Sequence, residues 1–323
     1  HQHLEKTKVK QKSLSNLEVA DEHLERFFII NKLKHYCDAL NYKAFLTIDA
    51  KIDIPNGFWD YIERKGYGTD PVIEIYHTIS LTLTNVEETK HYLKLQQLLE
   101  SHSKLFPKKE LRSLYVYATN YVIQQINNGN RAFLKVLYDL YYQSLNKGVL
   151  MDDKGILDHK HYNNIITLGM QQKDYDRTEE FITNYSGRLS EEFRENALNF
   201  NLANLYFTKQ EFSKVIEQLR YVEYQDIFYA LDSRLTLLKT YYELRENDAF
   251  NYLLDTFRNY LRRNKRLSKD FNSSYLNFLK VVKKISNTRK KDAEKIAKLE
   301  MNIKKENFMV NKDWLLEKLE ELK

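Results

Sequence analysis

The chain has 323 residues, a formal net charge of +6, and only 8 Gly and 3 Pro, far below the usual shares of about 7% and 5%. Its one cysteine, Cys37, excludes an internal disulfide framework and a cysteine-rich zinc site, and no apolar run approaches the roughly 18 residues of a membrane span. We therefore expect an all-α protein without a membrane span and with a cytoplasmic location. The first residue is His rather than Met, which is compatible with a fragment or with a form processed from a longer chain.

The N-terminal region begins without any periodic pattern. Residues 1–15 are polar and basic, which predicts a disordered or frayed start. A helix is then predicted from Leu17 to about Leu40, and Cys37 is interpreted as a small buried residue on it. Its expected inward stripe is Ala20, Leu24, Phe27, Phe28, Leu33, Tyr36 and Leu40.

Beyond this helix, turn residues and apolar periodicity divide the chain into further helices. Thr69 or Asp70 is placed to cap the helix that Pro71 opens. The pattern predicts about fourteen helices in total and no strand of any length. From residue 58 onward they fall near 58–65, 71–83, 86–102, 107–127, 131–147, 158–172, 174–186, 190–209, 211–223, 228–245, 247–263, 268–286, 289–306 and 312–322. The predicted organisation is an irregular helical part over 16–157, repeats over 158–262, and basic helices with a terminal cap over 263–323.

The clearest pattern is a pair of helices within residues 193–222. Apolar or small residues recur every three or four positions on both helices. They are Leu198, Leu202, Ala203, Leu205 and Tyr206 on the first, and Phe212, Val215, Ile216, Leu219 and Val222 on the second. The intervening residues 208–211 suffice only for a turn, so the two helices should be antiparallel neighbours. One such pair cannot bury both of its faces, which predicts similar pairs on either side.

These residues resemble the tetratricopeptide repeat over about residues 158–262. The family's motif positions are occupied by Leu202-Ala203, Tyr206, Phe212 and Val215, by Ile165-Ile166, Gly169, Tyr175 and Thr178 upstream, and by Leu237-Leu238 and Tyr241 downstream. Tyr175 and Phe212 are 37 residues apart and Tyr206 and Tyr241 are 35 apart, against roughly 34 in the family. Val215 and Thr178 replace the usual Ala, and no Pro closes a unit. The whole chain is also similar to uncharacterised bacterial helical-repeat proteins, a likeness that implies no activity.

The resemblance implies a right-handed α-solenoid of antiparallel helix pairs whose concave face binds a protein or peptide. The implied groove positions are Asn163, Asn164, Thr167, Asn201, Asn204, Phe207, Lys239 and Tyr242. Ala197 and Asp232 stand where family members that clamp a terminal carboxylate need basic residues, so that clamp is absent. Asn164 and Asn201 occupy equivalent positions and suit an amide ladder along a peptide backbone. The alternative is that Asn is simply abundant in this chain.

Positive charge is concentrated at the C-terminal end. Residues 262–323 hold 18 Lys and Arg against 9 Asp and Glu, whereas the remaining residues hold 33 against 36. The predicted basic patch is Arg262, Arg263, Lys265, Arg266, Lys283, Lys284, Arg289, Lys290 and Lys291. It is interpreted as a solvated face, as a site for an acidic protein, or as a nucleic-acid site in which Tyr260, Phe271 and Tyr275 stack on bases.

The sequence offers no pattern for catalysis, for a cofactor or for a metal. His159 and His161 are two residues apart on a predicted helix and point to different faces, so we interpret them as part of a solvated helix start. Adjacent carboxylates such as Glu179 and Glu180 lack any sign of a closed pocket that would separate their pKa values. The sequence thus predicts a non-enzymatic scaffold for a protein or peptide partner, with nucleic-acid binding through the basic segment as the alternative.

Overall fold

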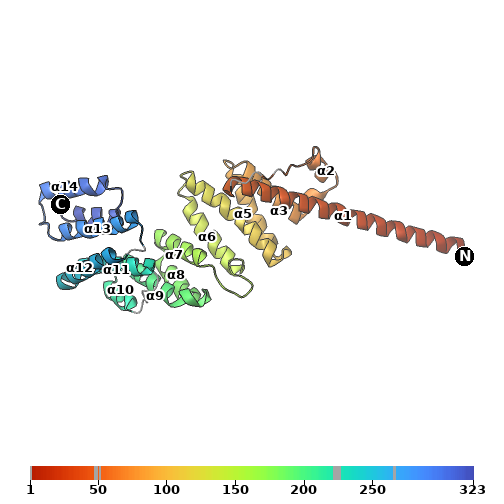
Figure 1. Ribbon diagram of the computed structural model, residues 1–323. Helices are drawn as coiled ribbons and strands as arrows, with labels where there is room; N and C mark the ends of the chain where they lie inside the picture. Colours follow the sequence, from red (N-terminus) through yellow and green to blue (C-terminus); the bar gives the residue numbers. More distant parts are fainter. Residues whose placement is uncertain (1, 47–49, 51, 221–226, 265–266) are drawn as a thin grey trace. The chain divides into compact units, whose positions relative to one another are not determined.

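A computed structural model describes residues 2–46, 50, 52–220, 227–264 and 267–323 (Figure 1). Within these ranges all regular secondary structure is helical, and an isolated bridge joins Met151 to Leu157. The predicted all-α class is therefore confirmed. The chain forms two compact units, unit 1 (His1–Lys173) and unit 2 (Asp174–Lys323). None of the described helices combines the length and hydropathy that crossing a bilayer requires.

Unit 1 consists of seven α-helices and two short 3₁₀ turns in its described residues. They are α1 (Gln2–Leu46), α2 (Phe58–Arg64), η1 (Tyr67–Thr69), α3 (Pro71–Thr84), α4 (Thr89–His102), η2 (Ser103–Leu105), α5 (Lys108–Asn127), α6 (Phe133–Asn146) and α7 (His159–Gln171). Of the two predicted caps, Asp70 is the one used: its carboxylate accepts hydrogen bonds from the backbone of Val72 and Ile73 at 2.8 and 3.4 Å.

Helix α1 is longer than predicted and only partly covered. It begins at Gln2 rather than near Leu17, because residues 2–16 contain helix formers and no Gly or Pro although they lack an apolar period. Its first part extends away from α2 and α3 (Figure 1). Leu33 and Cys37 are fully buried, as predicted, with the Cys37 thiol donating to the Tyr76 carbonyl oxygen. The predicted inward stripe is wrong at its N-terminal end, where Leu24, Phe27 and Phe28 are exposed. In this part of α1 the segment from α2 to Asp70 forms hydrogen bonds with the polar residues Glu25 and Arg26 instead.

Unit 2 consists of eight α-helices and one 3₁₀ turn in the part of it that is described. They are α8 (Tyr175–Tyr185), η3 (Ser186–Arg188), α9 (Glu191–Thr208), α10 (Phe212–Leu219), α11 (Ile227–Glu243), α12 (Asn247–Arg263), α13 (Lys269–Ser286), α14 (Ala293–Lys305) and α15 (Lys312–Glu320). The predicted pair is present as α9 and α10, packed along each other, with Leu202, Leu205 and Val215 buried between helices. Val222 lies outside the described residues.

Three helix–helix turns share one backbone conformation. Lys173, Gln210 and Arg245 have φ of 58°, 61° and 56°, and they are 37 and 35 residues apart. In each turn the amide of this residue donates to a carbonyl oxygen three residues back, and the preceding amide donates four residues back. A left-handed conformation is uncommon for residues other than Gly. The same two hydrogen bonds are also present at Gly129 and Gly148, and the three turns without Gly have the same spacing as the sequence pattern.

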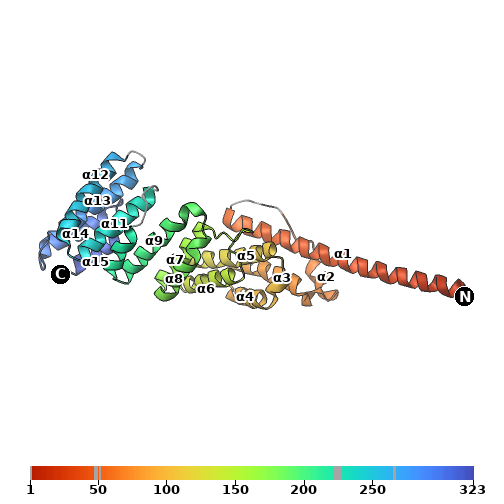
Figure 2. The same ribbon diagram turned by 90° about the horizontal axis from the view of Figure 1, so that it is seen from below.

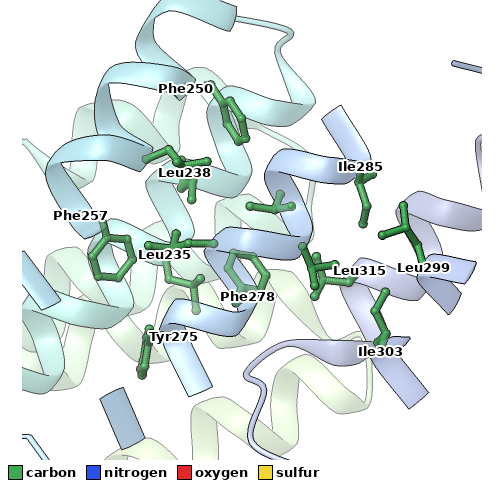
Figure 3. Packing of buried hydrophobic residues seen from close by; sticks show 14 of the residues in the cluster. Leu235, Leu238, Phe250, Phe257, Tyr275, Phe278, Ile285, Leu299, Ile303 and Leu315 are labelled. Atoms are coloured by element: carbon green, nitrogen blue, oxygen red, sulfur yellow. The ribbon is translucent and has the colours of Figure 1, made fainter. Parts of the chain in front are cut away.

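The core of unit 2 runs without interruption from α11 to α15. Leu235 and Leu238 of α11, Phe257 of α12 and Phe278 of α13 are almost fully buried together with Leu315 of α15 (Figure 3). Figure 2 shows these helices gathered into one group. The last helix, which was predicted to cover the end of the stack, is thus part of the same core.

Candidate functional site

Unit 1 contains a groove with a volume of about 550 Å³ between α5, α6, the start of α7 and the loop that joins α6 to α7. Side chains spaced three or four residues apart on α5 form one wall. They are Arg112, Val116, Thr119, Asn120 and Ile123. Tyr141 of α6 and His161 of α7 form the other side. The walls are mainly apolar with a few polar groups, the composition typical of ligand and peptide sites.

Arg112 fixes the loop that closes this groove. Its guanidinium donates to the carbonyl oxygens of Val149 at 2.8 Å and Met151 at 2.6 Å. The Asp152 carboxylate accepts from the backbone of Ile156 and Lys154, and these hydrogen bonds lower its pKa. The loop is therefore held both by Arg112 of α5 and by its own Asp152, which preorganises the groove.

His161 is less exposed to solvent than the sequence predicted. Asp158 does cap α7 by accepting from the backbone of Lys160 at 2.8 Å, but His161 is only partly exposed. Its Nδ1 is buried without a hydrogen-bond partner among the described residues, and its ring lies 5.8 Å from that of Tyr141. Burial lowers the pKa of His161 although Asp158 opposes this effect, so the imidazole is neutral at pH 7. The interpretation as a solvated helix start is wrong for this residue, because α6 covers one side of α7.

The predicted groove positions on α7 remain partly open. Asn164 and Thr167 are exposed, and the Asn164 amide donates to the Tyr141 hydroxyl at 3.1 Å. The amide of Asn163 contacts the ring of His159, with 3.3 Å to Nε2. Asn164 therefore lies one hydrogen bond from a side chain that lines the groove.

The predicted positions on α9 are more enclosed. Asn201 is only 7% exposed, and its amide donates to the Ala197 carbonyl oxygen one turn earlier on the same helix. The Asn204 side-chain oxygen accepts from Thr236 of α11 at 3.1 Å. Asn164 and Asn201, which the register makes equivalent, thus have different surroundings.

The predicted positions on α11 are covered by α15. The Lys239 ammonium lies 4.5 Å from the ring centre of Phe207 and donates to Asn311 at 3.0 Å, while Tyr242 packs edge-to-face on Trp314. Burial lowers the pKa of Lys239 to about 8, although Asp232 and other carboxylates oppose it. Phe207, Lys239 and Tyr242 are therefore brought together as predicted, but against the chain's own last helices.

A buried lysine closes the same face. Lys318 of α15 is 5% exposed and lies 2.9 Å from Glu243 of α11, whose carboxylate also accepts from the Trp314 indole at 3.0 Å. Lys318 pairs in addition with Glu317 and Glu321. Burial opposes its charge, but the three carboxylates outweigh burial and raise its pKa.

The predicted basic patch is divided among several surfaces of unit 2. Arg262 and Arg263 are exposed at the end of α12, and Arg289 and Lys291 are exposed in the turn before α14. Lys283 is partly exposed on α13. Lys284 lines a groove between α13 and α14, whereas Lys290 lines a different one beside α15. Lys265 and Arg266 lie outside the described residues.

The aromatic residues proposed to stack on nucleic-acid bases are engaged in the core. Tyr275 is 4% exposed and its hydroxyl donates to Asp232. Phe271 packs on Tyr275, and the Tyr260 ring is covered by the Arg234 guanidinium at 4.2 Å. These three rings are therefore not exposed for stacking on nucleic-acid bases.

Metal ligands are not grouped: the described residues contain no cluster of three or more His, Cys, Asp or Glu side chains able to hold a metal ion. Comparison of the chain with protein-family models, with characterised proteins and with solved structures finds no match. The sites described above are therefore interpreted from their own geometry.

Proposed function

We propose that this chain is a non-enzymatic scaffold of the tetratricopeptide type, a right-handed solenoid of antiparallel helix pairs that binds a protein or peptide partner. The recurrence of one turn conformation at Lys173, Gln210 and Arg245 supports the repeat. So does the burial of equivalent residues on successive first helices, Ile165 and Leu202 among them. Helical repeats commonly use such surfaces to hold extended partners.

The groove of unit 1 is the observation that carries the binding proposal. It offers about 550 Å³ behind the exposed edge of α5, enough for a large apolar side chain of a partner. Asn120 lines it, and the amide of Asn120 already donates to Asn41, which leaves its oxygen to accept from a peptide N–H. Asn164 lies next to the groove, because its amide donates a hydrogen bond to the hydroxyl of Tyr141, which lines the groove.

We therefore infer that the partner segment is an extended peptide with one large apolar residue. That residue would enter the groove beside Val116 and Ile123, while the amides of Asn120 and Asn164 bind the peptide backbone. Anchoring apolar or aromatic side chains usually supply most of the binding energy at such interfaces. The amides would contribute less and would fix the direction of the peptide.

A displayed peptide library selected on the full chain tests this proposal. Enriched peptides should share a large apolar residue, and their binding should be lost in Val116→Glu, which places a charge at the groove. The matched control is Leu93→Glu, because Leu93 of α4 is also an exposed apolar residue, 55% against 45%, but does not line the groove. Circular dichroism of both variants checks that helicity is retained.

Enriched peptides whose affinity is the same for wild type and Val116→Glu would contradict the proposal. So would a library that yields no enrichment on the folded wild-type chain.

A further inference from the structure

A second groove of about 560 Å³ lies on unit 2 between α13, α14 and the segment that follows α14. One face of α13 is buried in the core through Phe278, Leu279 and Val282, so the opposite face is presented outward. Asn277 holds the segment after α14 in place by donating to the Phe308 carbonyl oxygen at 3.0 Å. The groove is therefore built on the rigid core of the unit.

The rim of this groove carries three lysines that have no carboxylate partner in the part of the chain that the structure describes. Lys280 and Lys284 are one turn apart on α13, and Lys305 ends α14. None of the three forms an ion pair with any described residue. Nearby Glu300 is already paired with Lys304 at 2.6 Å and with Lys323 at 3.1 Å.

One carboxylate lines the groove beside the three ammonium groups. It belongs to Glu306, and one of its oxygens accepts from the backbone of Phe308 at 3.2 Å. The groove therefore has an excess of positive charge, and the mutual repulsion of the lysines is relieved when anionic groups bind between them.

The floor of the groove is apolar. Val281, Leu299 and Met309 line it, and Phe308 at its edge is 46% exposed. Asn302 and Asn307 add amides that can donate to carboxylate oxygens or to a peptide backbone. A ligand that fits this surface combines carboxylates with an apolar side chain.

We propose that this groove binds an acidic segment of a protein partner, in which Asp or Glu residues flank a large apolar residue. The apolar floor of Val281, Leu299 and Met309 suits a large aliphatic side chain, which a protein segment offers and a nucleic acid does not. This floor favours the carboxylates of a protein over the phosphates of a nucleic acid as the anionic groups that the lysines bind. The site is separate from the groove of unit 1 and does not depend on the function proposed there.

Fluorescence anisotropy with the full chain tests the proposal. The probe is a fluorescein-labelled peptide made of Glu and Leu, and the reference peptide has every Glu replaced by Gln. The wild type should bind the Glu peptide and not the Gln peptide. Lys280→Glu/Lys284→Glu should weaken binding by roughly a hundredfold, about tenfold for each reversed charge.

The matched control is Lys269→Glu/Lys298→Glu, which makes the same charge change at two exposed lysines outside the groove. It should weaken binding less than about threefold, because exposed charges at a distance are screened by salt. Circular dichroism confirms that both variants fold. Equal losses in the two variants would show general attraction to a basic surface and would overturn the proposal.

Labelled oligo(dT) is the competing probe. Tighter binding of oligo(dT) than of the Glu peptide, with the same dependence on Lys280 and Lys284, would assign the groove to nucleic acid instead. Equal binding of the Glu and Gln peptides would also overturn the proposal, since charge would then play no part.

Discussion

The groove of unit 1 and the α11 face of unit 2 contain similar side chains in opposite situations. Both contain aromatic rings next to side-chain amides and next to an ionisable nitrogen group. This group is the imidazole of His161 in the groove of unit 1 and the amino group of Lys239 on the α11 face. In unit 1 the space beside Tyr141 is open. In unit 2 the space beside Tyr242 is filled by Trp314, whose indole donates to Glu243. A residue at a groove position is therefore available for a partner only where the rest of the chain leaves it uncovered.

The largest change in stability is expected when the Trp314 ring, which covers the α11 face, is removed. Trp314→Ala removes contacts with Tyr242 and Phe278 and leaves a cavity, so the free energy of unfolding of unit 2 should fall by about 3–5 kcal/mol. Urea unfolding followed by far-UV circular dichroism measures it. Trp59, stacked on His77 in unit 1, remains as a fluorescent reporter of unit 1.

The control for this substitution is Tyr252→Ala, because Tyr252 is 75% exposed on α12. It should change the free energy of unfolding by less than about 0.5 kcal/mol. A Trp314→Ala variant as stable as Tyr252→Ala would mean that α15 does not cover α11 in solution.

A smaller loss is expected from Lys318→Met. Among the described residues, the substitution leaves Glu243 with the Trp314 indole as its one partner, and we expect a loss of about 1–3 kcal/mol. Lys323→Met is the matched control, since Lys323 is 46% exposed in its own pairs with Glu300 and Glu320 and should cost less than about 0.5 kcal/mol. Urea unfolding in a Trp59→Phe background, read by Trp314 fluorescence, compares the two. Equal costs would show that the burial of Lys318 has no energetic consequence.

The helices were predictable from the sequence because each depends on local signals. Pro71 and Asp70 begin α3 where expected, and the period of three and four placed Leu202 and Leu205 in the interior. The start of α1 was missed because Gln2 begins a stretch of helix formers that has no apolar face to reveal it.

The sites were less predictable because they depend on contacts between distant residues. Register placed Lys239 and Tyr242 in a groove, but only the fold brings Trp314 onto them, some 70 residues later in the chain. Lys280 and Lys305 were not predicted as site residues because they belong to different helices and are far apart in the sequence. The predicted basic patch consisted of runs of adjacent charged residues instead. Nor does any local signal separate the surroundings of Asn164 from those of Asn201.

A pH-dependent effect is expected from Lys239. Its pKa is about 8 in the folded chain against an ordinary value of 10.5, so between these pH values the unfolded chain binds a proton that the folded chain has lost. The contribution of Lys239 to the free energy of unfolding should therefore rise with pH across this window. Lys239→Met carries no proton, and its stability relative to wild type should fall from about pH 8 to 10.5. Urea unfolding of both proteins at several pH values measures this difference, and a constant difference would contradict the burial of the ammonium group.

The smallest effects are expected from the amides of Asn164 and Asn201. They compare an open face, that of Asn164 beside the groove of unit 1, with a covered face, that of Asn201 on α9. Asn201→Ala removes the hydrogen bond from a buried amide to Ala197, so the free energy of unfolding should fall by about 1 kcal/mol while peptide affinity stays unchanged. Asn164→Ala removes an exposed amide, which should cost less than about 0.5 kcal/mol in stability but weaken the selected peptides by about 1 kcal/mol. Urea unfolding and calorimetric titration with one selected peptide measure both quantities. If Asn201→Ala weakens the peptide as much as Asn164→Ala does, the partner also reaches the α9 face, and the contrast between the open and the covered face is wrong.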